Sequence, residues 1–195
     1  MKRYVLLTIP ASLLIYSCID TATSSQSSQA DSIAVTEPVV VDYEEDVTTP
    51  IVEEKSAWNY TESVDEMTDK TTYFATLTSE NSVDFDFPYD GGSRLILTIR
   101  DSPQYGKDIY IKISKGQFNS SINGTNIKVR FDENEAFTVH CNEASDYSTD
   151  ILFLSNYNKL LKNLKNSRTM KINVEFFSEG VRTFSFRTAD LEWHH

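Results

Sequence analysis

The sequence predicts an all-β fold, an antiparallel β-sandwich with one short amphipathic helix at about residues 155–166. Apolar and polar residues alternate with period two along most of residues 72–187, which is typical of strands that bury one face. Turn-forming residues separate the alternating runs, and one run has helical spacing instead. Residues 58–195 are numerous enough to bury one core, so we expect a single domain there.

Four strands are expected in the first half of this domain, at residues 72–78, 83–87, 94–100 and 108–114. Tyr73, Ala75 and Leu77 share one face of the first strand. The second strand alternates apolar and acidic residues, and a run of turn residues follows it. The third and fourth carry leucine or isoleucine at every second position, which predicts one buried face in each.

Five strands are expected in the second half, at residues 126–132, 135–141, 150–154, 169–177 and 181–187. The dipeptide Asn123-Gly124 favours a tight turn and stands before the first of them. The turn residues Ser178, Glu179 and Gly180 separate the last two strands, which we therefore expect to form a hairpin.

Tyr157, Leu160, Leu161 and Leu164 recur at helical spacing, which predicts an amphipathic helix with Ser155 as its N-cap. The opposite side of this helix carries Lys159, Lys162 and Lys165. We expect the apolar stripe to lie on the sheet and the lysines to face water, with contact to anionic lipid or glycan as the alternative.

The N-terminus has the layout of a lipoprotein signal peptide over residues 1–17. Lys2 and Arg3 precede an apolar run that is shorter than the roughly 20 residues of a transmembrane helix. Ser17 then stands directly before Cys18, which resembles a bacterial lipobox and predicts that Cys18 is the lipidated (palmitate-bearing) N-terminus. An ordinary cleaved signal with an incidental cysteine is the alternative. We expect an outer-membrane lipoprotein on the periplasmic face, because no acidic cluster follows Cys18 directly.

Residues 18–57 are expected to be a disordered, acidic tether. They are rich in small polar residues, and residues 19–57 contain nine acidic side chains and one basic one. Such a composition cannot bury enough apolar surface to order its backbone. Thr21 and Ser32 each follow an aspartate and precede an apolar residue, a pattern similar to bacterial O-glycosylation sites, so both are candidates for modification.

The charge and the residue types of the domain argue against several function classes. It carries twenty acidic and fifteen basic side chains, which disfavours nucleic acid as a partner. Its histidines are His140, His194 and His195, and the last two lie at a terminus that we expect to fray. No catalytic triad or three-histidine metal site can be assembled from them. We expect no cofactor and no enzymatic activity.

Cys141 alternates with Phe137 and Val139, which predicts a buried apolar thiol rather than a nucleophile. Its neighbour His140 would point to the opposite face of the same strand, so a Cys–His catalytic pair is not expected. Because Cys18 is expected to carry lipid, no intramolecular disulfide is expected either.

Paired carboxylates are the remaining candidates for chemistry. Asp84 lies beside Asp86, and Asp132 lies near Glu133 and Glu135. A glycosidase needs two carboxylates about 5–9.5 Å apart across a cleft, but exposed strand faces carry such pairs routinely. The second group lacks the glycine and the spacing of a calcium loop, so we expect a solvated turn there.

Four tyrosines are expected in or beside turns, namely Tyr89, Tyr105, Tyr147 and Tyr157. Gathered on one surface, they would stack on sugars or contact a protein. Placed singly, they would cover the margins of the core with their hydroxyls in water. These are two alternative interpretations of the same residues.

Several segments resemble the VasI/TagO-like proteins of type VI secretion loci. The likeness begins with Trp58 and residues 67–77, and it continues through a basic-ended strand at residues 95–100 and through residues 127–132. It ends with Phe153-Leu154 before the amphipathic helix and with residues 184–186 of the final hairpin. The resemblance implies a non-enzymatic envelope accessory that binds protein partners, such as a cell-wall enzyme.

We therefore expect a binding or accessory module for protein partners, associated with secretion or the cell wall. A glycan-binding surface lipoprotein is the first alternative, and a hydrolase built on the strand carboxylates is the second. Exposed aromatic side chains around a hollow would favour a glycan, whereas an open edge strand would favour a protein partner. Two carboxylates facing each other in a cleft, one with a raised pKa, would favour the enzyme.

Overall fold

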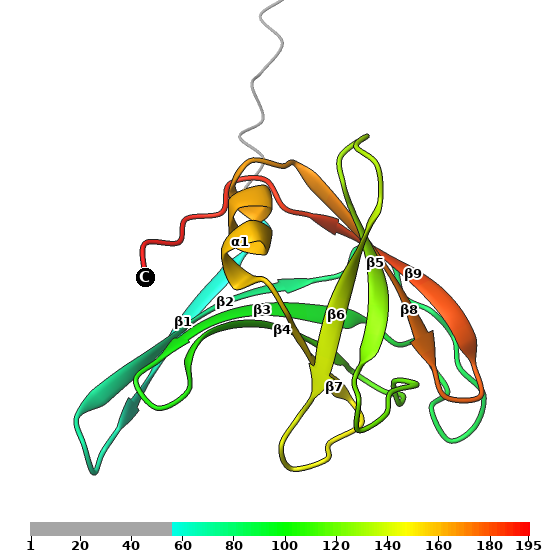
Figure 1. Cartoon of the computed structure of the whole chain (residues 1–195), viewed down its shortest axis with the longest axis horizontal. Helices are drawn as coiled ribbons and strands as arrows, with labels where there is room; N and C mark the ends of the chain where they lie inside the picture. The colour runs from blue at the N-terminus through cyan, green and yellow to red at the C-terminus, as the bar shows by residue number, and fades with distance from the viewer. Residues whose placement is uncertain (1–55) are drawn as a thin grey trace, which may run out of the picture. The chain divides into compact units, whose positions relative to one another are not determined.

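The structure is a computed structural model that describes residues 56–195 (Figure 1). The expected signal peptide, Cys18, Thr21 and Ser32 lie outside the described residues, as do all but the last two residues of the expected tether. The described residues belong to one compact unit.

Nine strands and one helix make up this described region. They are β1 (Asn59–Asp65), β2 (Lys70–Thr78), β3 (Leu95–Ser102), β4 (Gly106–Ile113), β5 (Thr125–Phe131), β6 (Phe137–Glu143), β7 (Ile151–Leu154), α1 (Tyr157–Lys165), β8 (Thr169–Phe176) and β9 (Gly180–Arg187). The strands form one antiparallel sheet in the order β1-β2-β3-β4-β7-β6-β5-β8-β9. The expected all-β fold with a single short helix is confirmed.

The strand register brings the inward-facing residues into continuous rows. Ala75 on β2 is opposite Ile99 on β3, which is opposite Ile109 on β4. Ile109 is opposite Leu154 on β7, and Leu154 is opposite Cys141 on β6. All five side chains are buried. The period-two alternation of the sequence thus becomes one apolar face that runs across five strands.

The sheet curves so that inward-facing residues from β2 to β9 share one core. Figure 1 shows β5, β6, β8 and β9 crossing the direction of β1 to β4. The segment after β2 then reaches the edge of β9 that is not paired with β8, where the N–H of Glu80 donates to the carbonyl of Ser185 at 2.8 Å. The two layers of the expected sandwich are therefore two halves of one curved sheet, joined where β7 pairs with β4 on one side and with β6 on the other.

Residues 83–87 form a loop, so the strand expected there is wrong. Within this segment, only Val83 makes a β-bridge, to Ser93. Phe85 is buried with its ring 4.8 Å from that of Phe176, and the N–H of Asp86 donates to a carboxylate oxygen of Glu179 at 2.8 Å. The apolar position that suggests a strand is the buried side chain of Phe85, which anchors the loop. The backbone N–H of Asp86 is satisfied by the Glu179 side chain and not by a neighbouring strand.

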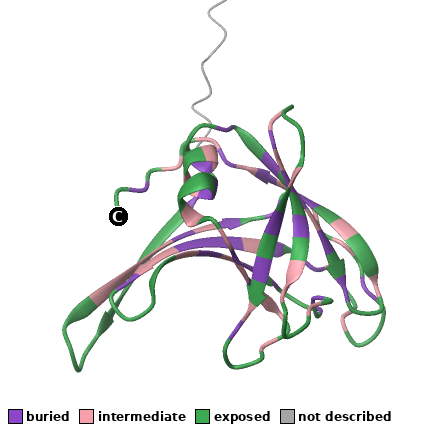
Figure 2. Cartoon of the chain, in the orientation of Figure 1, coloured by how far each residue is buried: buried purple, intermediate pink, exposed green. Residues whose placement is uncertain are grey.

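The sequence does not predict β1, because none of its seven residues is buried and no periodicity marks it (Figure 2). The tight turn after Asp65 forms the hairpin that pairs β1 with β2. The Asp65 carboxylate accepts the N–H of Met67 at 2.8 Å, and Asp69 has a φ of 53°. Local turn chemistry therefore creates this strand without help from a buried face.

The helix α1 covers Tyr157–Lys165, within the expected range of about residues 155–166, and Ser155 is not its N-cap. The N–H of Ser155 donates to the carbonyl of His140 at 2.9 Å, which extends the pairing of β6 with β7. Asn156 takes the N-cap position with a φ of 65° and makes no side-chain capping bond. Leu160 and Leu164 are buried as expected. No helix within residues 56–195 has the length and apolar character needed to cross a bilayer.

The last residues of the chain pack against α1 and β2, so the expectation of a frayed C-terminus is wrong. Trp193 is 2% exposed, and its indole N–H donates to the hydroxyl of Tyr157 at 3.2 Å. The ring of His195 stacks on Tyr73 with 3.9 Å between centroids. The expected lysine face of α1 is exposed, although Nζ of Lys165 also donates to the carbonyl of Trp193.

Candidate functional site

Cys141 and His140 lie on opposite faces of β6, as their adjacent positions predict. Cys141 is fully buried, and burial raises the pKa of its thiol to about 12. His140 is exposed, with Nδ1 3.3 Å from the side-chain oxygen of Asn126. A thiol that stays protonated and has no imidazole beside it is a core residue and not a nucleophile.

The carboxylates singled out from the sequence lie in loops and turns. Asp84 and Asp86 are exposed in the loop of residues 83–92. One oxygen of Asp132 accepts the N–H groups of Arg168 and Thr169 at 3.0 and 2.8 Å, so this aspartate fixes the backbone at the start of β8. In the part of the chain that the structure describes, no three histidine, cysteine, aspartate or glutamate side chains are placed to hold a metal ion.

An arginine on β3 lies on the outer face of the sheet, the face opposite the core. Arg100 on β3 is in register with Phe74 on β2 and with Asp108 on β4. The Nε of Arg100 donates to one oxygen of Asp108 at 3.1 Å, and its Nη2 donates to the other. Such a bidentate pair fixes the orientation of the guanidinium plane.

Three aromatic rings surround this guanidinium. The Cζ of Arg100 lies 4.9, 5.5 and 5.8 Å from the ring centroids of Tyr105, Tyr110 and Phe153. Tyr110 and Phe153 are cross-strand neighbours on β4 and β7, with 5.3 Å between their centroids. These distances are within the range of about 6 Å over which a cation is attracted to a ring face. Arg100 is therefore held from several sides and forms a firm support for Tyr105.

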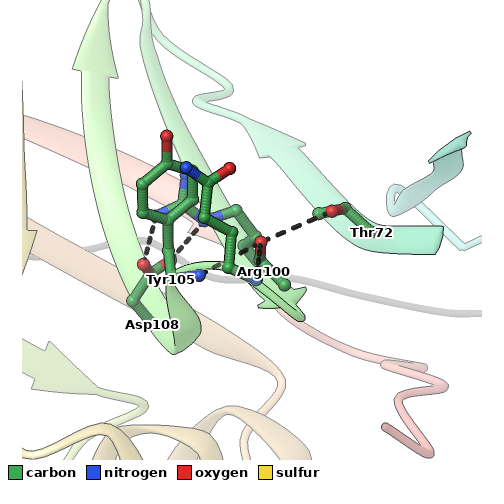
Figure 3. Close-up of polar contacts among 6 residues, drawn as sticks. Thr72, Arg100, Tyr105 and Asp108 are labelled. Carbon is green, nitrogen blue, oxygen red and sulfur yellow. Dashed lines mark hydrogen bonds and ion pairs between the residues drawn. The ribbon is translucent and has the colours of Figure 1, made fainter. Parts of the chain in front are cut away.

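The turn between β3 and β4 places Tyr105 over Arg100 (Figure 3). The hydroxyl oxygen of Ser102 accepts the N–H groups of Gln104 and Tyr105 at 3.3 and 3.4 Å. The hydroxyl of Thr72 on β2 donates to the same oxygen at 3.4 Å. Ser102 is buried, whereas Tyr105 is 64% exposed. The turn therefore presents a tyrosine ring that is supported from below and open to solvent.

Two hollows flank this arginine and share Tyr105 as part of their walls. One has a volume of about 480 Å³ and is also lined by Ser63 and Phe74. The other has a volume of about 440 Å³ and is bounded by Phe153 and by the loop of residues 144–150. We call the two hollows, with Arg100 and Tyr105 between them, the outer-face groove.

The charges that line the outer-face groove are balanced. The cations are Lys70, Arg100 and Lys112, and the anions are Asp65, Asp146 and Asp150. A hydrogen bond from the N–H of Met67 lowers the pKa of Asp65, and one from the hydroxyl of Ser148 lowers the pKa of Asp146. Both carboxylates are therefore ionised at neutral pH. The groove offers both signs of charge without a net excess of either.

The two edges of the sheet differ. At the β9 edge, the Asn81 side chain donates to the carbonyl of Thr183 at 3.0 Å and accepts the N–H of Ser185 at 2.8 Å. At the other edge, β1 pairs with β2 only, among the strands described. Every residue of β1 is exposed, including Val64 at 53%. One edge is thus capped and the other is open.

Of the four tyrosines expected in or beside turns, two cover the margins of the core and two are exposed. Tyr89 and Tyr157 pack against the core, while Tyr105 and Tyr147 are exposed. Of these four, Tyr105 lines the outer-face groove. Sequence reasoning missed the partners of Tyr105, although a signal for them exists. The strands β2, β4 and β7 each carry an aromatic residue at a position that the alternation assigns to solvent.

Comparison with protein-family models, curated proteins and solved structures finds no match to this chain.

Proposed function

We propose that this chain is a non-enzymatic, lipid-anchored binding module of the cell envelope, and that its partner is a protein that adds a strand to β1. The observation that carries this proposal is that the β1 edge of the sheet is open, whereas the β9 edge at the opposite end is capped. An unpaired edge presents rows of N–H and C=O groups, and natural proteins usually cover or blunt such edges. Strand addition uses these groups for affinity and the alternating side chains for specificity.

The side chains of β1 indicate which residues a partner strand would need. Glu62 and Asp65 are acidic, and β1 contains no lysine or arginine. In an antiparallel pair centred on Glu62, two copies of β1 would place Glu62 opposite Glu62, and like charges directly opposite on paired strands are destabilising. Tyr60 and Val64 flank Glu62 on one face of the strand and are exposed. A partner strand with a basic residue opposite Glu62 and an apolar residue on either side of it would complement β1.

The location of this module rests on the sequence. The lipobox-like arrangement at Cys18 and the acidic tether of residues 18–57 support a domain held near the outer membrane, with the periplasmic face preferred. The resemblance to VasI/TagO-like proteins supports an accessory role beside secretion or cell-wall proteins. The lipid at Cys18 would be the membrane contact, and nucleic acid is not a partner in this proposal.

Site-specific photocrosslinking tests the partner and the anchor together. A benzophenone amino acid replaces Val64 on β1 in the full chain, which is expressed in its native cells. We expect a protein adduct in the membrane fraction, and we expect a Cys18→Ser variant to leave that fraction and lose lipid labelling. Val181 on β9 is the matched control, because its exposure of 54% is close to the 53% of Val64 while its edge is capped.

No adduct at residue 64, or an equal adduct at residue 181, would contradict partner binding at β1. Retention of lipid by the Cys18→Ser variant would contradict the anchor alone. The two parts of the proposal therefore fail separately.

A further inference from the structure

We propose that the outer-face groove binds a neutral polysaccharide or oligosaccharide, with Tyr105 as its stacking platform. The groove lies on the outer face of the sheet and reaches β1 through the side chains of Ser63 and Asp65, whereas the protein partner is assigned to the backbone edge of β1. It consists of two hollows of about 480 and 440 Å³ that share Arg100 and Tyr105. Each volume lies within the roughly 300–1,000 Å³ of small-molecule sites, so we infer room for at least one sugar unit on each side of Arg100.

The aromatic side chains of the groove match the apolar faces of sugar rings. Tyr105 is 64% exposed although its ring is supported by the guanidinium at 4.9 Å. Phe74 lines one hollow and Phe153 lines the other, and both are partly exposed. An aromatic ring that is fixed from one side and open on the other provides flat contact area at little further cost in conformational entropy.

The polar side chains of the groove suit the hydroxyl groups at the edge of a sugar ring. Hydroxyl groups from Ser63, Thr68 and Thr72, together with the amide of Gln104, line the first hollow. The second hollow carries Ser145, Ser148 and the carboxylate of Asp146. A hydroxyl both donates and accepts, whereas a carboxylate accepts two or more hydrogen bonds, and sugar hydroxyls need both kinds of partner.

The charge balance favours a neutral ligand. Three cations and three carboxylates line the groove, so it lacks the excess of basic residues that would draw in a phosphate or an acidic polymer. Several of these charges are already paired. Arg100 is bonded to Asp108, and Nζ of Lys112 lies 3.5 Å from Asp150.

An extended peptide fits the groove less well than a sugar chain does. The backbone groups of β2, β3 and β4 are paired with one another in the sheet, so they are not free to pair with a peptide lying on this face. The peptide amides would meet side chains alone. The open backbone groups are at the edge of β1, which is where the protein partner is proposed.

Affinity electrophoresis tests this inference. The full chain is run through native gels that contain, one at a time, glucan, mannan, xylan or soluble chitin fragments, with alginate as the acidic comparison. We expect at least one neutral polysaccharide to retard the chain more than alginate does. Tyr105→Ala should weaken that retardation at least tenfold, and Tyr105→Phe should retain most of it because the ring remains.

Phe177→Ala is the matched control, because Phe177 has 63% exposure and lies in the β8–β9 turn, outside the groove. We expect it to bind like the wild-type chain, and we expect all three variants to keep the urea midpoint of the wild type, as surface substitutions do. Three results would each overturn the inference: no retardation by any neutral polysaccharide, stronger retardation by alginate, or equal losses in Tyr105→Ala and Phe177→Ala. The crosslink at residue 64 should not depend on Tyr105, so this inference and the proposed function fail independently.

Discussion

Gly124→Ala is expected to lower the free energy of unfolding by about 2–5 kcal/mol. A Cβ at this position would lie 2.3 Å from the carbonyl oxygen of Cys141 and 2.8 Å from Cε1 of His140. The φ of 77° strains any L-residue by about 1–2 kcal/mol. Relieving an overlap with backbone costs about 1–3 kcal/mol more. Urea unfolding, followed by the fluorescence of the buried Trp58 and Trp193, measures the change from the midpoint and slope.

Gly106→Ala is the matched control for this prediction. Its φ of 76° is almost the same, but a Cβ at residue 106 would meet nothing within 4 Å. We expect a loss of only about 1–2 kcal/mol from strain. Equal losses at the two glycines would show that the close approach of the residue 124 turn to β6 is not as described.

Phe176→Ala is expected to cost about 3–5 kcal/mol, the usual range for removing a buried phenylalanine. Phe176 is 1% exposed at the end of β8. Its ring centroid lies 4.8, 5.0 and 5.9 Å from those of Phe85, Phe118 and Phe184. Because Phe85 and Phe118 anchor the loops after β2 and after β4, the amides of both loops should also exchange faster with solvent. Urea unfolding and amide hydrogen exchange measure the two effects.

Phe177→Ala provides the comparison, since Phe177 follows directly in the chain but is 63% exposed. Its backbone N–H donates to the carbonyl of Gln117 at 2.9 Å, and alanine would keep that bond. We expect a change within about 0.5 kcal/mol. A larger loss in Phe177→Ala than in Phe176→Ala would mean that the two side chains are assigned to the wrong faces.

The sequence predicts the strands that have one buried face. The segments around Leu97, Ile111, Val129 and Ile172 carry apolar residues at every second position, and each is a strand with those residues in the core. The helix is equally clear, because Leu160 and Leu164 lie one turn apart on its buried side. In these segments burial itself creates the periodicity, so the sequence pattern and the structure have one cause.

The sequence fails where other forces decide the structure. The strand β1 has no buried face and is held by pairing with β2 and by the turn at Asp65, neither of which leaves a periodic pattern. Residues 83–87 have the pattern without the strand, because Phe85 alone needs burial and a carboxylate of Glu179 satisfies the backbone at Asp86. Ser155 has the chemistry of an N-cap, but its N–H is already used in sheet pairing.

The candidate site was only partly predictable for a similar reason. The exposed Tyr105 could be singled out as a turn aromatic. Its neighbours Phe74, Arg100 and Phe153 lie on three different strands, and only the strand register brings them together. The sequence signal for this site is an aromatic residue at a strand position that the alternation assigns to solvent. Such a residue says more about a binding surface than a further apolar residue in the core does.

Amide hydrogen exchange along β1 tests the central claim of partner-strand addition most directly. The measurement compares the domain alone with the complex trapped by the crosslink at residue 64. In an antiparallel pair, alternate residues already direct their N–H groups to β2. We predict that the other β1 amides, which point away from β2, exchange at least about tenfold more slowly in the complex, while β9 is unchanged. Unchanged exchange along β1, or new protection at β9, would contradict the claim.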